Sequence, residues 1–208
     1  MFITFEGIEG SGKSTQLKKC EEFLTKKGYP ILVTKEPGGT DLGKTIRNWL
    51  LNPETTFHHR YSELLLFIAD RCEHVESIIK PALSEKKIVL CDRFKDSTLA
   101  YQYAGRQGDK TLIYSLNNLV TIDPDITLLF DCRIETGLSR AKARAKLDRF
   151  EDENTAFHQR IQDMYHTLAK KHSDRFNIIS TEDSIDNVFN KTISLLEEAL
   201  HKKGYHES

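Results

Sequence analysis

Nine residues near the start of the chain constrain its fold more than any other feature. They read Gly7-Ile8-Glu9-Gly10-Ser11-Gly12-Lys13-Ser14-Thr15 and fit the pattern G-x-x-x-x-G-K-[ST]. They follow an apolar run, Met1–Phe5, with the composition of a buried strand, and they lead into a stretch of helical periodicity, Gly12–Lys27. In this context the glycines let backbone N–H groups turn inward around a phosphate chain, and the helix begins with its positive end toward the anion. The sequence therefore predicts a triphosphate site between the first strand and the first helix.

Within this loop, Lys13 is expected to contact the β- and γ-phosphate oxygens, and Ser14 is expected to hold Mg²⁺. The predicted ATP-binding residues are Gly7, Glu9, Gly10, Ser11, Gly12, Lys13, Ser14 and Thr15. The loop alone does not separate ATPases, GTPases and kinases. GTPases are disfavoured, because the chain has no D-x-x-G segment and its one N-K dipeptide, Asn190-Lys191, is followed by Thr192-Ile193 instead of an aspartate that could recognise guanine.

The order of apolar and helical segments predicts an α/β fold. Short apolar runs alternate with long stretches of helical periodicity, which is the pattern of a parallel sheet covered by helices on both faces. The expected strands are Met1–Phe5, Ile31–Thr34, Ile88–Cys91, Ile126–Phe130 and Phe176–Ser180. The expected helices are Gly12–Lys27, Asp41–Leu51, Tyr61–Glu85 with a kink or break near Pro81, Asp96–Ala104, Asp109–Thr121, Glu135–Ala145, Thr155–Ser173 and Ser184–Lys203. With neither internal repeats nor a flexible linker, residues 1–208 are expected to fold as a single domain.

Composition excludes several classes of protein. Thirty basic residues face 31 acidic ones, for a net charge of −1, which argues against a nucleic-acid partner. No apolar run approaches the ~20 residues of a membrane span, and residues 1–15 lack the pattern of a signal peptide, so we expect no membrane partner and a cytoplasmic protein. The cysteines are expected to be free thiols; they are Cys20, Cys72, Cys91 and Cys132. The histidines show no metal-ligand spacing.

A second group of charged residues follows the third expected strand. Asp92 and Arg93 come directly after Ile88–Cys91, at the carboxyl end of a parallel strand, where ligand sites of such sheets form. Asp92 could hold Mg²⁺ through water, and Arg93 could bind a phosphate of the acceptor in a bidentate manner. An ordinary ion pair at the strand end is the alternative. Asp131, which also ends an apolar strand, is the rival metal carboxylate.

Two further segments have the chemistry of substrate contacts. Phe67 and Arg71 are four residues apart on one helical face, so a ring that stacks on a base and a guanidinium that meets its oxygen would lie side by side, although Phe67 could equally be a core residue. The segment Leu138–Arg149 carries five cations, namely Arg140, Lys142, Arg144, Lys146 and Arg149. These cations suit either a solvated surface or a lid that closes over ATP and brings an arginine to the transferred phosphoryl group.

Several motifs in this order resemble those of the thymidylate kinase family. They are the phosphate loop, Lys35-Glu36-Pro37-Gly38-Gly39-Thr40, Leu66-Phe67-Ile68-Ala69-Asp70-Arg71, the run from Asp92 to Gln102, and Ala141–Glu151. The resemblance implies a P-loop NTPase fold with a five-stranded parallel sheet and a short lid at about residues 138–152. It also implies transfer of the γ-phosphoryl group of ATP to dTMP, with Mg²⁺, to give dTDP for dTTP synthesis.

The resemblance also assigns roles to individual residues. Phe67 stacks on thymine, Arg71 meets its O4 and Thr98 binds the base edge. Arg93 and Arg47 bind the dTMP phosphate, and Tyr101 lies under the sugar. The implied substrate-binding residues are Glu36, Arg47, Phe67, Arg71, Arg93, Ser97, Thr98, Tyr101 and Gln102; the implied metal residues are Ser14 and Asp92.

The position of the arginines places the chain with the bacterial type of the family. Glu9 stands in the phosphate loop where other members carry an arginine, so the catalytic cation is expected in the lid, with Arg144 as the first candidate. The implied catalytic residues are Lys13, Arg93, Arg140, Arg144 and Arg149. Family members are typically homodimers packed through helices, and the apolar face of Tyr61–Ile79 (Leu64, Leu65, Ile68, Cys72, Val75, Ile79) could form such an interface or belong to the core.

Two other functions share the phosphate loop. A deoxynucleoside kinase would need a carboxylate base near the end of the second strand, and Glu36 is placed there. A P-loop ATPase that acts as a switch would use nucleotide binding to change a partner surface. A nucleoside monophosphate already presents an ionised oxygen as the nucleophile, so a nucleoside monophosphate kinase needs no general base.

Overall fold

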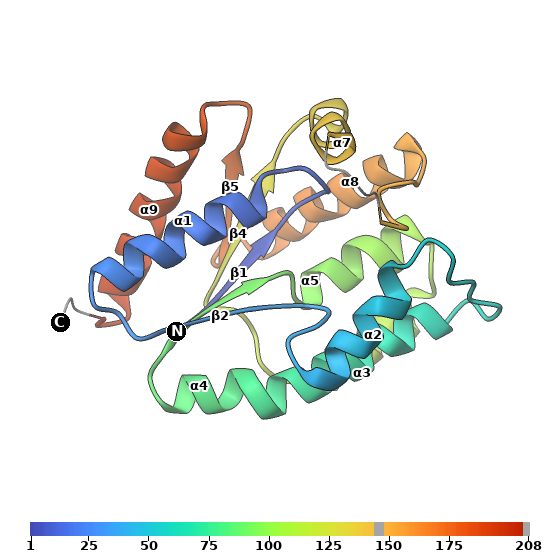
Figure 1. Cartoon of the computed structure of the whole chain (residues 1–208), viewed down its shortest axis with the longest axis horizontal. Helices are drawn as coiled ribbons and strands as arrows, with labels where there is room; N and C mark the ends of the chain where they lie inside the picture. The colour runs from blue at the N-terminus through green and yellow to red at the C-terminus, as the bar shows by residue number, and fades with distance from the viewer. Residues whose placement is uncertain (144–147, 206–208) are drawn as a thin grey trace.

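The structure, a computed structural model, describes residues 1–143 and 148–205. Its centre is a five-stranded, fully parallel sheet with the strand order β2-β3-β1-β4-β5 (Figure 1). The strands are β1 (Phe2–Glu6), β2 (Ile31–Lys35), β3 (Ile88–Asp92), β4 (Ile126–Asp131) and β5 (Phe176–Ser180). The predicted α/β class with five parallel strands is confirmed. Because β1 lies between β3 and β4, the residues that follow these three strands meet at one edge of the sheet.

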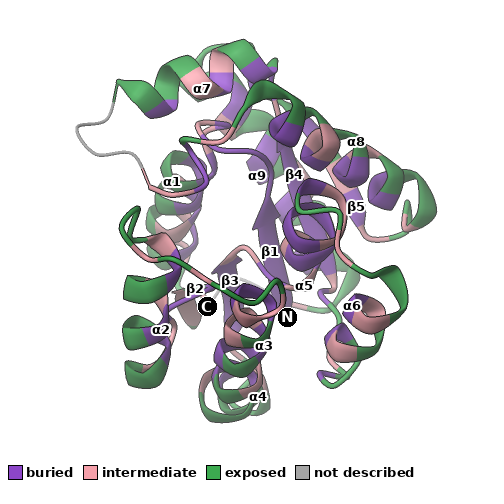
Figure 2. Cartoon of the chain, turned by 90° about the vertical axis from the view of Figure 1, so that its right-hand side faces the viewer, coloured by how far each residue is buried: buried purple, intermediate pink, exposed green. Residues whose placement is uncertain are grey.

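Helices cover both faces of this sheet (Figure 1). They are α1 (Lys13–Lys26), α2 (Asp41–Leu51), α3 (Ser62–His74), η1 (Val75–Ile79), α4 (Lys80–Ser84), α5 (Lys95–Thr98), η2 (Leu99–Gly105), α6 (Lys110–Asn117), α7 (Ile134–Lys142), α8 (Thr155–Lys171) and α9 (Ile185–Lys202). Alternation along β1 sends Ile3 and Phe5 into a core with α1 and α9, whereas Phe2 packs against η1 and α4 on the opposite face. Strand residues are buried on both faces in the middle of the sheet, as Figure 2 shows. The sheet is thus a rigid base for the loops at its carboxyl edge.

Two π-helical segments replace parts of the helices that periodicity predicts. The helix expected over Tyr61–Glu85 is divided into α3, η1 and α4, and it changes from π-helix to α-helix between Ile79 and Lys80, directly before Pro81. The helix is continuous at this point, because the N–H of Lys80 donates to the carbonyl oxygen of Val75, and the π-helical turn of η1 directly precedes the proline. The second π-helix, η2, continues α5 and occupies most of the expected helix Asp96–Ala104. π-helical turns are frequent at functional sites, and η2 carries Tyr101 and Gln102.

The apolar face of Tyr61–Ile79 belongs mostly to the core. Leu64, Ile68, Val75 and Ile79 are buried in this chain, whereas the Leu65 side chain is 52% exposed. The four cysteines are free thiols, and three of them are buried. Among the described helices, none combines the length and the apolar character that a membrane crossing requires.

Candidate active site

The loop from Gly7 to Gly12 joins β1 to α1 and turns at three glycines with positive φ, at Gly7, Gly10 and Gly12. Gly10 shows why a side chain is excluded: its φ is 69°, and a Cβ there would lie 1.9 Å from the carbonyl oxygen of Gly137. The first turn of α1 has no side-chain cap. Its N–H groups are therefore available to an anion, which they would stabilise together with the helix dipole.

Lys13 lies at the start of α1, with its ammonium group folded back over the loop. Its Nζ donates hydrogen bonds to the carbonyl oxygens of Gly7 (3.0 Å) and Ile8 (2.7 Å). Burial, and next the neighbouring Arg93, lower the pKa of Lys13 to about 8. The ammonium is therefore held at the cleft by carbonyl groups that a phosphate could replace.

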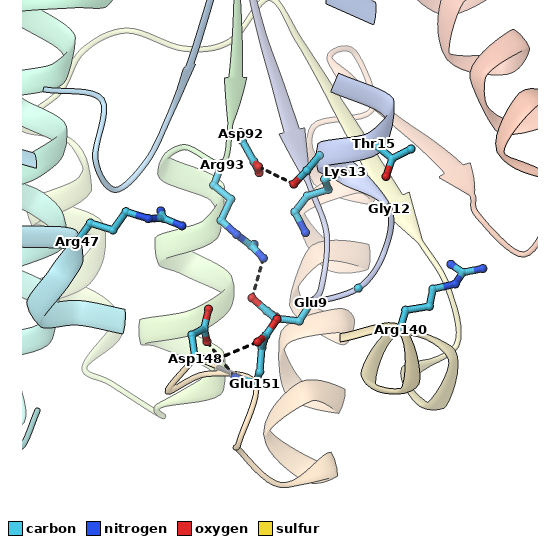
Figure 3. A pocket seen from close by; sticks show the side chains of 12 residues that line it. Glu9, Gly12, Lys13, Thr15, Arg47, Asp92, Arg93, Arg140, Asp148 and Glu151 are labelled. Atoms are coloured by element: carbon cyan, nitrogen blue, oxygen red, sulfur yellow. Dashed lines mark hydrogen bonds and ion pairs between the residues drawn. The ribbon is translucent and has the colours of Figure 1, made fainter. Parts of the chain in front are cut away.

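Asp92 has the chemistry of a metal contact. It ends β3, and its Oδ2 accepts a hydrogen bond from the Ser14 hydroxyl at 3.2 Å, while its buried Oδ1 has no partner among the described residues (Figure 3). An unpartnered carboxylate oxygen beside a hydroxyl suits Mg²⁺, which binds few protein ligands and keeps several waters. The rival carboxylate, Asp131, is occupied by Gln162 at 2.8 Å and by His166 at 3.1 Å. Asp92 and Ser14 therefore fit the metal better than Asp131 does.

Arg93 follows Asp92 with a φ of 68°, a conformation rare for a residue with a side chain. Its guanidinium donates to Glu9 Oε1 at 2.8 Å (Figure 3). It also donates to the carbonyl oxygen of Gly7 at 2.9 Å and lies over the ring of Tyr101. Burial alone would lower the pKa of Arg93, but Tyr101 and Glu9 raise it well above its usual range. Burial likewise opposes the charge of Glu9, yet Arg93 and Lys13 hold its pKa below the usual value. A charged pair thus sits at the centre of the site.

Two cavities meet at this pair. The phosphate cavity has a volume of about 340 Å³ and is lined by Glu9, Gly10, Gly12, Lys13, Ser14, Thr15, Arg47, Asp92, Arg93, Arg140, Asp148 and Glu151. The aromatic cavity is lined by Glu9, Glu36, Pro37, Arg47, Leu51, Phe67, Arg71, Arg93, Phe94, Ser97, Thr98, Tyr101, Gln102, Asp148 and Phe150. Among the residues that the structure describes, four line both cavities, namely Glu9, Arg47, Arg93 and Asp148. All nine side chains expected from the resemblance to bind the acceptor lie around the aromatic cavity.

A buried hydrogen-bond network holds Arg71 in the aromatic cavity. Arg71 Nε donates to Glu36 Oε2 at 2.7 Å, and Nη1 donates to Thr98 (2.9 Å) and to Asn117 (2.8 Å). The other Glu36 oxygen lies 3.0 Å from His74 Nδ1. Nη2 of Arg71 has no hydrogen-bond partner in the described part of the chain and remains available to a ligand. Glu36 orients Arg71, and because both of its oxygens are bound it is not poised as a base.

The segment Glu36–Thr40 is held against α3 by backbone contacts. Asp70 Oδ1 accepts a hydrogen bond from the N–H of Gly38 at 3.0 Å, and a Cβ on Gly39 would lie 2.4 Å from the His74 ring. The second glycine therefore allows the loop to approach α3 closely. Arg47 donates to the carbonyl oxygen of Pro37 at 2.8 Å, which directs its guanidinium toward the junction of the two cavities.

A sequence profile of thymidylate kinases matches residues 5–192 of this chain. The chain belongs to the thymidylate kinase family. It is 44% identical to the thymidylate kinase of Exiguobacterium sp., over 98% of this chain and 97% of that protein. It is 46% identical to the thymidylate kinase of Geotalea daltonii, over 89% and 91% of the two chains. The crystal structure of thymidylate kinase from Ehrlichia chaffeensis superposes with a TM-score of 0.78 at 40% identity, covering 95% of this chain and 98% of that one.

Within this thymidylate kinase fold, the expected catalytic arginines are distributed unequally. Arg93 and Arg140 line the phosphate cavity, and Arg140 also donates to the carbonyl oxygen of Thr181 at 3.1 Å. Arg149 lines neither cavity, because its guanidinium binds Glu63 and the carbonyl oxygen of Leu50. Arg144, the first candidate for the catalytic cation, lies outside the described residues. Gly7 and Ser11 of the loop do not line the phosphate cavity; instead, each accepts a hydrogen bond from Lys13 Nζ.

Several residues of the site had no role assigned from the sequence. Asp148 and Glu151 line the phosphate cavity, and each accepts a hydrogen bond from the backbone N–H of the other. The sequence shows that both residues are acidic. It does not show that their side chains point into the phosphate cavity, because that depends on the turn at residues 148–151. Asn117 on α6 binds Arg71 from 46 positions away, and no local pattern identifies it.

Proposed function

We propose how the residues of the two cavities carry out the reaction of the thymidylate kinase family, in which the γ-phosphoryl group of ATP passes to dTMP to give dTDP. ATP places its phosphates in the phosphate cavity, and dTMP places its base in the aromatic cavity. The observation that carries this arrangement is the junction of the two cavities at Arg93, Arg47, Glu9 and Asp148. There the acceptor phosphate would meet the γ-phosphate.

On the donor side, the N–H groups of the loop and of the first turn of α1 bind the phosphates, and Lys13 exchanges its carbonyl partners for phosphate oxygens. Ser14 and Asp92 hold Mg²⁺, directly or through water, because Asp92 Oδ1 has no other partner among the described residues. When bound, this ion neutralises charge on the β- and γ-phosphates.

On the acceptor side, thymine stacks on Phe67, and the free Nη2 of Arg71 donates to the O4 of the base. Tyr101 lies under the sugar of dTMP. The site therefore binds a deoxyribose and excludes a ribose, because a 2′-hydroxyl would collide with the Tyr101 ring. The Tyr101 hydroxyl is bound to Glu9 Oε2 at 2.5 Å, which fixes the ring in this place. Gln102 and Thr98 complete the wall around the base.

Transfer needs alignment and charge neutralisation but no base, because the dTMP phosphate is already ionised. Arg93 and Arg47 bind the acceptor phosphate at the junction, and Lys13 stabilises the transferred group. Residues 138–152 act as a lid that excludes water, with Arg140 and Arg144 as its cations. Arg93 must exchange its bonds to Glu9 and Gly7 for the phosphate, so substrate binding releases Glu9 toward the sugar hydroxyl.

The alternative functions find less support. A deoxynucleoside kinase would need Glu36 as a base, but both Glu36 oxygens are bound, by Arg71 and by His74. A switch ATPase would not require the aromatic cavity beside the phosphate loop. The geometry favours a monophosphate acceptor.

We also propose that two copies of the chain associate through the α2 and α3 surface. Leu42, Trp49 and Leu65 are each more than half exposed there, at 53%, 53% and 52%. Large apolar side chains that share a surface are typical of interfaces. A homodimer in light scattering, and a monomer for the variant Trp49→Glu, would support this surface. We place the protein in the cytoplasm, because its free thiols suit a reducing compartment.

The test of the reaction is ADP release from ATP and Mg²⁺ with one acceptor at a time. We expect strong stimulation by dTMP, weaker stimulation by dUMP and none by thymidine. A Lys13→Met variant, purified in the same way, measures contaminating kinases. Stimulation by thymidine alone would contradict the proposal and return Glu36 to the role of base. Equal ADP release with and without every acceptor would indicate a switch ATPase.

A further inference from the structure

Glu63 is a buried carboxylate outside both cavities, and the reaction as described does not use it. It lies in the first turn of α3, and its side chain is only 8% exposed. Such a carboxylate is rarely buried unless its charge is balanced. Here the partners come from two separate parts of the chain, the end of η2 and the segment before α8.

The two oxygens of Glu63 have different partners. Oε1 accepts a hydrogen bond from Gln102 Nε2 at 3.0 Å and from Arg106 Nε at 3.4 Å. Oε2 accepts a charge-assisted bond from Arg149 Nη2 at 2.6 Å. Gln102 lines the aromatic cavity, and Arg149 stands between Asp148 and Phe150, which line it as well. Glu63 therefore connects a wall of the cavity with its cover.

The cover itself is Phe150, the residue after Arg149. Its ring lies 5.7 Å from Tyr101 and 6.1 Å from Phe67, measured between centroids, so it faces the two rings that the proposed function assigns to the sugar and the base. Arg149 and Arg106 both lie over Phe150, at 5.0 and 5.4 Å. The two arginines that Glu63 binds are thus the ones that hold Phe150 in place.

The charges of Glu63 and its neighbours balance one another. Arg106 also pairs with Glu153, so two carboxylates face two guanidinium groups. Arg149 has further contacts with α2 and with the segment after it. Its Nε donates to the carbonyl oxygen of Leu50 at 3.1 Å, its backbone N–H donates to the carbonyl oxygen of Leu51 at 3.3 Å, and its guanidinium lies 4.8 Å from the centroid of the Phe57 ring. Removal of the Glu63 charge would leave Arg149 without any carboxylate partner among the described residues, and Arg149 is largely buried, with 17% of its side chain exposed.

From these contacts we propose that Glu63 is a positioning residue of the acceptor site. It holds Gln102 in the cavity wall and, through Arg149 and Arg106, holds Phe150 over the bound base. Arg149 accordingly anchors the end of the lid and does not act on the transferred phosphoryl group. This inference rests on the proposed function, because it assigns the aromatic cavity to the base of dTMP.

The test is the variant Glu63→Gln, which keeps the shape of the side chain but removes its charge and turns an N–H donor toward Arg149. We expect KM for dTMP to rise about tenfold, since a charge-assisted hydrogen bond is lost, while kcat and KM for ATP stay within about twofold. A merely structural role would lower the amount of active enzyme, and so kcat, without raising KM for dTMP. The matched control is Glu76→Gln, an exposed glutamate that forms an ion pair with Lys80 one turn away and should leave all three constants unchanged.

A second variant keeps the inference testable if Glu63→Gln does not fold. Arg149→Lys retains the charge but cannot bind Glu63 and the Leu50 carbonyl oxygen at once. We expect a rise of about fivefold in KM for dTMP with kcat nearly unchanged, and non-additive effects when the two changes are combined. A loss of kcat by orders of magnitude in Arg149→Lys, with KM for dTMP unaltered, would overturn the inference and make Arg149 a catalytic residue. An unchanged KM for dTMP in both variants would overturn it as well, provided that the wild-type chain phosphorylates dTMP; absence of that activity would instead refute the proposed function.

Discussion

The phosphate cavity and the aromatic cavity are built in different ways, although four of the described residues line both. The loop of the phosphate cavity comes from one continuous segment, and its shape depends on backbone turns such as that of Gly10. The aromatic cavity is assembled from Glu9 of the phosphate loop, the segment after β2, α2, α3, the chain from Arg93 through η2 and the segment before α8. Its central residue, Arg71, depends on side chains 27 to 46 positions away. One region is specified locally and the other by tertiary packing. Changes in the first should therefore act on ATP, and changes in the second on dTMP.

The largest expected effect comes from Lys13→Met. The variant removes the cation beside the transferred group but keeps the length of the side chain, so we expect kcat/KM for ATP to fall by about a thousandfold. KM for dTMP should change little, because Lys13 does not line the aromatic cavity. Steady-state assays with each substrate varied in turn would check this. A comparable rise in KM for dTMP would break the distinction between the two cavities.

Arg71→Lys tests the aromatic cavity. Lysine keeps a positive charge beside Glu36 but cannot bind Glu36, Thr98 and a base oxygen at the same time. We expect KM for dTMP to rise about thirtyfold, the cost of one hydrogen bond to a charged group, with KM for ATP nearly unchanged. The exposed Arg133→Lys serves as the control for an arginine-to-lysine change. Equal losses for both substrates would point to damage to the fold.

Asp92→Asn tests the metal assignment. The amide cannot replace the charge of the carboxylate, so we expect the Mg²⁺ concentration for half-maximal activity to rise roughly tenfold. Asp131→Asn is the matched control, because Asp131 is occupied by Gln162 and His166. If Asp131→Asn, and not Asp92→Asn, raised the Mg²⁺ concentration for half-maximal activity, the metal contact would have to be assigned to Asp131 at the end of β4.

The smallest expected effect concerns pH. The pKa of Lys13 is lowered to about 8, so Lys13 is mostly charged below this pH and mostly neutral above it. ATP binding should therefore weaken as pH rises, and we expect KM for ATP to increase about fourfold between about pH 7 and about pH 8.5. KM for dTMP should stay level, because Arg93 keeps its charge throughout this range. A flat KM for ATP would show that Lys13 stays charged.

Sequence reasoning succeeded where the signal is local. The glycines of the phosphate loop, the five apolar strands and the pair Asp92 and Arg93 at a strand end all follow from short-range patterns. It also brought Phe67 and Arg71 to one helical face, and both line the aromatic cavity. These features were predictable because helix and strand periodicity fixes which side chains lie together.

The remaining features depend on contacts between distant segments. Periodicity predicted ordinary helices where η1 and η2 are π-helical, because these segments of five and seven residues are too short to show a period of their own within a longer helical stretch. The positive charge of Arg149 suggested a phosphate contact, but its direction is set by Glu63, 86 positions earlier. Asn117 likewise acquires its role only when α6 packs beside α3. Arg144 lies outside the described residues, so its catalytic role stays a prediction.

The most direct test of the two-cavity account is calorimetric titration of dTMP and of an ATP analogue that cannot be hydrolysed, each into the wild-type chain, Lys13→Met and Arg71→Lys. The account predicts a crossed result: Lys13→Met loses affinity for the ATP analogue and keeps its affinity for dTMP, whereas Arg71→Lys does the reverse. Parallel loss of both affinities in either variant would contradict it and show that the two cavities act as a single binding unit.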